Sequence, residues 1–133
     1  MGLTVLDAGV VMAVLDAADG HHAAARAALS GALARGDELV LPASAYAESV
    51  VGPSRRGGAA VAALDAFLDD VPVRVAPLTR PVAAVAARLR VIHAPALRLP
   101  DALVLATAEM AAADLLITTD GRLPAGDLRV QIV

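Results

Sequence analysis

Lysine is missing from this chain, because all eleven basic residues are arginine. This absence excludes the P-loop lysine of nucleotide-binding enzymes, Schiff-base lysines and a lysine acting as general base. Cysteine is also missing, which excludes disulfides, thiolate zinc sites and cysteine nucleophiles. Chemistry on this chain must therefore come from carboxylates, arginines, hydroxyls or the three histidines.

Aromatic side chains and net positive charge are scarce as well. Tyr46 and Phe67 are the only tyrosine and phenylalanine, and tryptophan is absent, so aromatic platforms that stack single-stranded bases are not expected. The net charge is −3, so no overall basic field attracts phosphate. Nucleic-acid binding would need local arginines or bound cations.

The chain offers no segment suited to a membrane or to secretion. Its N-terminus lacks the positive charge of a signal peptide, and Asp7 interrupts the first apolar run. No apolar run approaches the roughly 20 residues that span a bilayer. We therefore expect a cytoplasmic protein without membrane contact.

Short continuous apolar runs alternate with stretches of helical spacing, as in a parallel sheet covered by helices on both faces. The predicted fold class is α/β: one domain over residues 1–133, an α/β/α sandwich with a central, mainly parallel sheet of four to five strands. Strands are expected at 3–6, 38–41, 73–76 and 115–118, with a possible fifth at 128–133. Helices are expected at 9–16, 22–35, 43–51, 59–68, 81–90 and from about 100 to 112, and residues 52–58 form the clearest loop.

Two acids follow predicted strands. Asp7 comes directly after the first strand and Asp120 two residues after the fourth, and the site of a parallel sheet lies at the carboxyl ends of its strands. Each also has a purely structural interpretation, Asp7 as a helix N-cap and Asp120 as part of an Asp-Gly turn. Taken singly, these structural interpretations are favoured.

Two further acids lie on predicted helices. Asp101 opens an apolar helix, where the helix dipole alone could explain an acid, although we expect protein to cover that helix start. Glu48 has Ser44, Ala45 and Val51 as helical neighbours and no basic residue within a turn. A carboxylate buried without a partner costs several kcal/mol unless it is neutralised or binds a cation, so a functional role is favoured for Glu48.

Taken together, Asp7, Glu48, Asp101 and Asp120 suggest a metal site. Four converging carboxylates would raise one another's pKa, and a divalent cation removes that conflict. Mg²⁺ and Mn²⁺ prefer hard oxygen ligands and suit phosphate substrates. Such a metal activates water for phosphodiester hydrolysis without lysine or cysteine.

The remaining polar residues give weaker signals. His21, His22 and His93 lack the spacing of a zinc site and are expected on the surface. Arg55-Arg56 is expected in a solvated loop, with a phosphate contact as the functional alternative. Arg122 follows Asp120 and is the better phosphate candidate.

Four short motifs surround the acids, which lie 41, 53 and 19 positions apart. Each motif is weak alone, but four in this order are a specific pattern. They are Val5-Leu6-Asp7-Ala8 with Val10-Val11, Pro42-Ala43 leading into Ala47-Glu48, Leu99-Pro100-Asp101-Ala102-Leu103 with Ala106-Thr107-Ala108, and Leu116-Ile117-Thr118-Thr119-Asp120 with Arg122-Leu123.

At these motifs the sequence resembles the PIN-domain nucleases, specifically the VapC-type toxins of bacterial toxin–antitoxin pairs. The resemblance implies an endoribonuclease that uses Mg²⁺ or Mn²⁺ and is inhibited by a cognate antitoxin whose C-terminal segment covers the site. It also implies a homodimer, and a role for Thr118 in hydrogen bonding near the metal. The sequence departs from the family at Gly9, where a hydroxyl or amide residue is frequent, and at Thr119, where some relatives carry another polar or acidic group.

Two other functions remain open at this point. A phosphatase or response-regulator receiver could use a similar sheet, but these proteins place a lysine near the phosphoryl group. A binding protein could keep the scaffold and lack catalytic activity. The presence of all four acids argues against this alternative.

Overall fold

The computed structural model describes residues 1–133 and contains one five-stranded sheet. The strand order is β3-β2-β1-β4-β5, and every neighbouring pair is parallel. The α/β fold with a parallel central sheet is therefore confirmed. The strands are β1 (Leu3–Leu6), β2 (Glu38–Pro42), β3 (Val73–Ala76), β4 (Leu115–Thr118) and β5 (Val130–Ile132).

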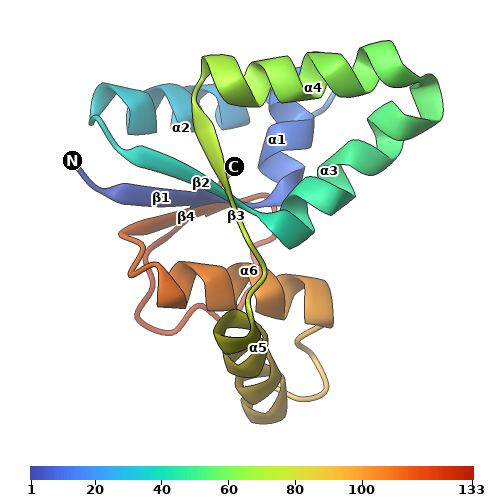
Figure 1. Cartoon of the computed structure of the whole chain (residues 1–133). Coiled ribbons are helices and arrows are strands. Elements are labelled where there is room, and N and C mark those ends of the chain that lie inside the picture. The colour runs from blue at the N-terminus through green and yellow to red at the C-terminus, as the bar shows by residue number, and fades with distance from the viewer.

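Helices cover both faces of this sheet. Figure 1 shows α5 and α6 on one side, and α1, α2 and α4 on the other. The helix α3 continues from the end of β2 along the margin of the sheet and leads into α4. The helices are α1 (Ala8–Leu15), α2 (His22–Ala34), α3 (Ala43–Arg56), α4 (Gly58–Asp70), α5 (Arg80–Ile92) and α6 (Leu99–Met110). None of them is long and apolar enough to cross a bilayer.

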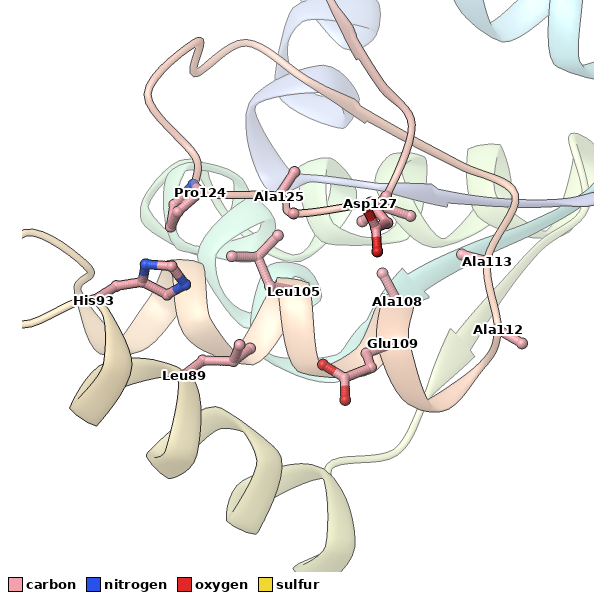
Figure 2. Close-up of a pocket in the computed structure, with 12 residues that line it drawn as sticks. Leu89, His93, Leu105, Ala108, Glu109, Ala112, Ala113, Pro124, Ala125 and Asp127 are labelled. Carbon is pink, nitrogen blue, oxygen red and sulfur yellow. The ribbon is translucent and has the colours of Figure 1, made fainter.

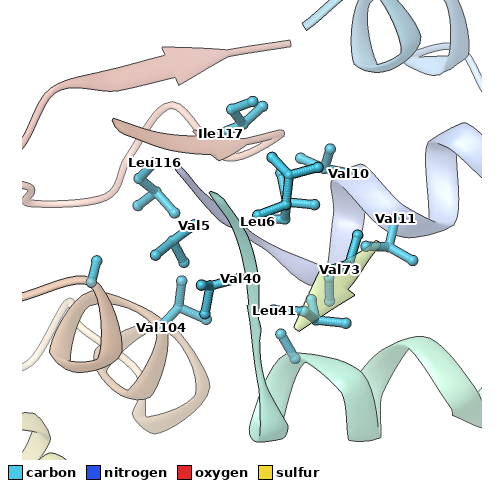
Figure 3. Packing of buried hydrophobic residues seen from close by; sticks show 14 of the residues in the cluster. Val5, Leu6, Val10, Val11, Val40, Leu41, Val73, Val104, Leu116 and Ile117 are labelled. Carbon is cyan, nitrogen blue, oxygen red and sulfur yellow. The ribbon is translucent and has the colours of Figure 1, made fainter. Parts of the chain in front are cut away.

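Aliphatic side chains form the core, as the shortage of aromatic residues predicts. The central strands β1, β2 and β4 are buried over nearly their whole length, which explains their continuous apolar sequence. Figure 3 shows Val5, Val40 and Leu116 at the face toward α6. The alanine side chains of α6 are small, so the backbone of this helix can approach the strands closely.

The predicted loop at residues 52–58 is wrong. The helix α3 continues through Pro53 to Arg56, and only Gly57 separates it from α4. A proline inside a helix removes one backbone hydrogen bond, but Pro53 is buried against the core, which offsets that loss. Gly57 breaks the helix with a φ of 116°, a conformation that favours glycine.

The position of the site follows from the order of the strands. From β1 the chain proceeds outward through β2 to β3, and then returns so that β4 pairs with the other side of β1. The strand order thus reverses between β1 and β4. In parallel α/β sheets, ligands bind outside the carboxyl ends of the strands at such a reversal, and here Asp7 and Asp120 follow those two strands.

Candidate active site

Asp7 lies at the junction between β1 and α1. Its backbone N–H donates to the Ile117 carbonyl of the neighbouring strand at 3.0 Å. Its Oδ1 accepts from the Ala8 N–H at 2.7 Å, so Asp7 caps the helix α1. The structural interpretation of this residue is correct, yet the cap occupies only one of the two carboxylate oxygens.

Thr118 fixes the second oxygen of Asp7. Its buried hydroxyl donates to Asp7 Oδ2 at 2.8 Å and accepts from the Asp120 N–H at 3.0 Å. One hydroxyl therefore joins the ends of β1 and β4 and orients the carboxylate between them.

Asp120 forms the predicted turn. Its Oδ1 accepts from the Arg122 N–H at 2.9 Å and from Arg122 Nε at 3.2 Å. The backbone hydrogen bond from Arg122, with smaller contributions from its guanidinium, lowers the pKa of Asp120 below its ordinary value of 3.8. This carboxylate stays ionised at neutral pH and keeps Oδ2 free of any hydrogen bond.

Asp101 lies in the first turn of α6 and is half-buried. Desolvation, followed by the charges of Asp7 and Asp120, raises the pKa of Asp101, whereas Arg98 and Arg122 oppose the shift. The expected protein cover over this helix start is absent, because Arg98 to Pro100 are exposed and the buried stretch begins at Ala102. The raised pKa therefore reflects partial desolvation and crowding of negative charge.

Glu48 is exposed on α3, which contradicts its predicted burial in a small apolar environment. The buried face of α3 runs through Ala45, Ser49 and Pro53, at spacings of four residues, and Glu48 lies beside that face. Even so, partial desolvation and then the charges of Asp7 and Asp101 raise the pKa of Glu48. Its link to the other acids rests on their proximity and not on a buried charge.

The four acids thus share one electrostatic environment but do not enclose a preformed metal site. No group of three or more histidine, aspartate and glutamate side chains lies close enough together to hold an ion. The donor chemistry nevertheless fits Mg²⁺ or Mn²⁺, because carboxylate oxygens are hard ligands. The pKa of Glu48 and of Asp101 is raised first by desolvation and then by neighbouring negative charge, which a bound cation would offset.

The histidine expectation is correct in part. His21 is exposed, but His22 is half-buried, with its Nδ1 2.7 Å from the Ala13 carbonyl oxygen. His93 is also half-buried, and it lines a cavity that reaches Asp101 and Asp120. The expectation of a surface position fails for His22 and His93. Neighbouring segments partly cover both rings, and a local sequence pattern does not record that packing.

The sequence pattern did not predict that Arg98 lies near the site acids. Arg55 and Arg56, expected in a loop, occupy the last turn of α3 and do not contribute to the pKa of any site acid. Arg98 instead acts on both Glu48 and Asp101. Its place immediately before α6, three residues ahead of Asp101, was the available signal.

Comparison with known proteins identifies the family of the chain. The family profile of the PIN domain matches residues 4–127. No curated protein matches the chain.

Solved structures share the whole fold at low sequence identity. Mycobacterium tuberculosis VapC20, described as a sarcin-ricin loop cleaving toxin, has a TM-score of 0.75 at 21% identity, with 94% of this chain and 95% of that chain covered. VapBC2 from Rickettsia felis, solved with a promoter DNA fragment, has a TM-score of 0.76 at 17% identity and 98% coverage of both chains. FitAcB from Neisseria gonorrhoeae has a TM-score of 0.69 at 24% identity and 96% coverage of both. With a family match across nearly its full length, this chain belongs to the PIN-domain family.

Proposed function

We propose that this protein is the toxin of a type II toxin–antitoxin pair, of the VapC type, and that it hydrolyses RNA phosphodiester bonds as a metal-dependent endoribonuclease. The observation that carries the proposal is the placement of the acids: Asp7 and Asp120 follow β1 and β4 and are joined through the Thr118 hydroxyl. Glu48 on α3 and Asp101 on α6 lie near enough to Asp7 that its charge adds to desolvation in raising the pKa of both. Membership of the PIN family favours this function over a phosphatase or a receiver domain.

Asp7, Glu48, Asp101 and Asp120 would hold Mg²⁺ or Mn²⁺. When bound, the metal supplies an activated water and neutralises charge that develops on the phosphate. Thr118 keeps the Asp7 carboxylate oriented through its 2.8 Å hydrogen bond. Arg122, whose side chain is 92% exposed, can contact a substrate phosphate while its Nε remains on Asp120.

A cognate antitoxin is the proposed protein partner, and we also propose a homodimer. The similar structures include a toxin–antitoxin complex from Klebsiella pneumoniae and the VapBC2 and FitAB complexes. These complexes support the partner by similarity of fold. Action on cellular RNA would take place in the cytoplasm, as the sequence predicts.

The test is cleavage of total RNA by purified protein freed of antitoxin. Discrete products are expected with Mg²⁺ or Mn²⁺, and none with chelator or with Asp101→Asn. Asp69→Asn is the matched control, because Asp69 is an exposed acid in the last turn of α4. Equal cleavage by folded Asp101→Asn protein and by the control would contradict the proposed site.

One observation favours a second candidate, a binding protein that has lost catalysis. No three of the acidic side chains lie close enough together to form a preformed metal site. Under this alternative, folded protein would bind antitoxin but would bind neither Mn²⁺ nor RNA. Calorimetric titration with Mn²⁺ separates the two candidates.

A further inference from the structure

A groove extends the acid cluster toward the end of α5. This groove, of about 480 Å³, is formed by the end of α5, the α5–α6 connection, the first turn of α6 and the segment after β4. Asp101 and Asp120 belong both to the acid cluster and to the groove. Its other polar side chains are His93, Arg98 and Arg122, so one imidazole and two guanidinium groups adjoin the carboxylates.

The guanidinium group of Arg98 in this groove has no partner within the protein. Its exposed side chain makes no hydrogen bond or ion pair, unlike Arg35, Arg74 and Arg88, which all pair with acids. Arg98 lies near enough to Asp101 to lower the pKa of that carboxyl group, yet no ion pair joins the two side chains. A guanidinium that is held beside carboxylates and not bound to them keeps its donors available for phosphate oxygens.

Arg122 leaves most of its donors available as well. Its Nε and backbone N–H contact Asp120, and no hydrogen bond uses its terminal nitrogens. The two arginines come from different elements, the start of α6 and the loop after β4, and line the same groove. Two separate guanidinium groups beside an acid cluster suit a phosphodiester chain, whose phosphates repeat at each nucleotide.

His93 adds a flat ring to the same wall. Figure 2 shows this ring extending from the end of α5 below Pro124, where it also borders an adjoining cavity with Leu89 and Leu105. The imidazole is half-buried and makes no hydrogen bond with the protein. A half-buried ring that borders open space and has no hydrogen bond to the protein can stack on an unpaired base, as histidine does in RNA recognition.

We propose that this groove binds the nucleotide adjoining the scissile phosphate of a single-stranded RNA segment, with Arg98 and Arg122 on its phosphates and His93 stacked on its base. The proposal rests on the proposed ribonuclease function and names the substrate contacts of that site. A paired base cannot stack on the ring, so the groove selects unpaired nucleotides.

The test measures RNA binding by fluorescence anisotropy in an Asp7→Asn background with Mg²⁺, because Asp7 does not line the groove and its replacement keeps the RNA intact. The probes are a labelled 12-nucleotide RNA of random sequence and a duplex of the same length. The variants are Arg98→Ala, Arg98→Lys, Arg122→Ala, His93→Ala and His93→Phe. Arg26→Ala is the charge-matched control, because Arg26 is exposed on α2 and makes no hydrogen bond or ion pair.

Removing one arginine–phosphate interaction should reduce the slope of log K against log salt concentration by about 0.7 for single-stranded RNA. We expect this change for Arg98→Ala and Arg122→Ala, less for Arg98→Lys, and none for Arg26→Ala. His93→Ala should weaken single-strand binding by about 5- to 100-fold, with little effect on the duplex, and His93→Phe should retain binding.

The two levels of the proposal fail in different ways. If the unaltered protein cleaves RNA and the groove variants behave like Arg26→Ala, the groove assignment is wrong and the ribonuclease stands. If His93→Ala weakens single-strand and duplex binding equally, base stacking is wrong. If the Asp7→Asn protein binds no RNA and the unaltered protein cleaves none, both the ribonuclease function and the groove assignment are wrong.

Discussion

The Thr118 hydroxyl donates to Asp7 Oδ2 at 2.8 Å, although the two residues lie 111 positions apart in the chain. The same oxygen of Thr118 accepts the Asp120 N–H. Thr118 is wholly buried, whereas Asp7 and Asp120 are half-buried.

Thr118→Val should lower the free energy of unfolding by about 1–3 kcal/mol, because it leaves a carboxylate oxygen and a backbone N–H without their partner. Valine keeps the shape of threonine, so the effect isolates the hydroxyl. Urea denaturation at pH 7 measures it. Thr118→Ser should retain any stabilisation by Mn²⁺ that Thr118→Val loses, and equal Mn²⁺ responses would show that the hydroxyl does not orient the site.

Gly9 and Thr119 should be energetically coupled. A β-carbon at Gly9 would meet the Thr119 hydroxyl at less than van der Waals separation, with Thr119 Cβ and Cγ2 both at 3.4 Å. Gly9→Ala should therefore cost about 1–3 kcal/mol by overpacking, although alanine is ordinarily the better helix residue. In a double-mutant cycle, adding Thr119→Ala should recover most of that cost; additive effects would contradict the coupling.

Asp37 should give the protein an acid-dependent stability. Desolvation acts to raise its pKa, but hydrogen bonds from Thr4 and Arg35, the Arg35 charge and the Gly2 N–H outweigh it, so the pKa falls below 3.8. The native state then binds fewer protons than the unfolded state. The stabilisation is present above the unfolded pKa and is lost as pH falls through the lower, folded pKa.

Urea midpoints measured between about pH 6 and pH 2.5 test this prediction, because that range brackets the ordinary pKa of aspartate. The unaltered protein should lose stability over the acidic end of that range more steeply than Asp37→Asn does. Parallel curves for the two proteins would show that Asp37 is not the group responsible.

In the protein without metal, the ionised side chain of Glu48 should destabilise the folded state slightly. Its pKa is raised above 4.5, so its contribution is favourable at low pH and is lost as pH rises through the folded pKa. Because the side chain is exposed, Glu48→Gln at pH 7 with chelator should be neutral or stabilising by no more than about 0.5 kcal/mol.

Mn²⁺ at about a hundred times its dissociation constant should stabilise the unaltered protein by about 2.7 kcal/mol, and Glu48→Gln should abolish much of this stabilisation. Thermal unfolding with Mn²⁺ or chelator measures it. Glu109→Gln is the control, because Glu109 is an exposed acid paired with Arg88. Identical Mn²⁺ responses in both variants would exclude Glu48 as a ligand.

Much of this architecture is evident in local sequence patterns. Apolar runs predicted the buried strands β1, β2 and β4, because strands buried on both faces admit no polar alternation. The edge strand β3 was also predicted although it contains Arg74, and the edge strand β5 was predicted only as a possible fifth strand. The position of Asp7 and Asp120 after two such runs was enough to place them at the carboxyl edge. The limits of α3 were not predictable in this way, since Gly-Pro within residues 52–53 has the local chemistry of a turn and burial of Pro53 overrides it.

The sequence by itself determined the parallel sheet, the aliphatic core and which acids follow strands, because these depend on hydrophobicity and chain direction alone. Only the tertiary structure decided that Glu48 is exposed beside the buried face of α3, and that Thr118 bonds both Asp7 and Asp120. It also decided that His93, Arg98 and Arg122 share one groove. These relations join segments that are distant along the chain, and their geometry is fixed by how helices pack on the sheet, which no local spacing records.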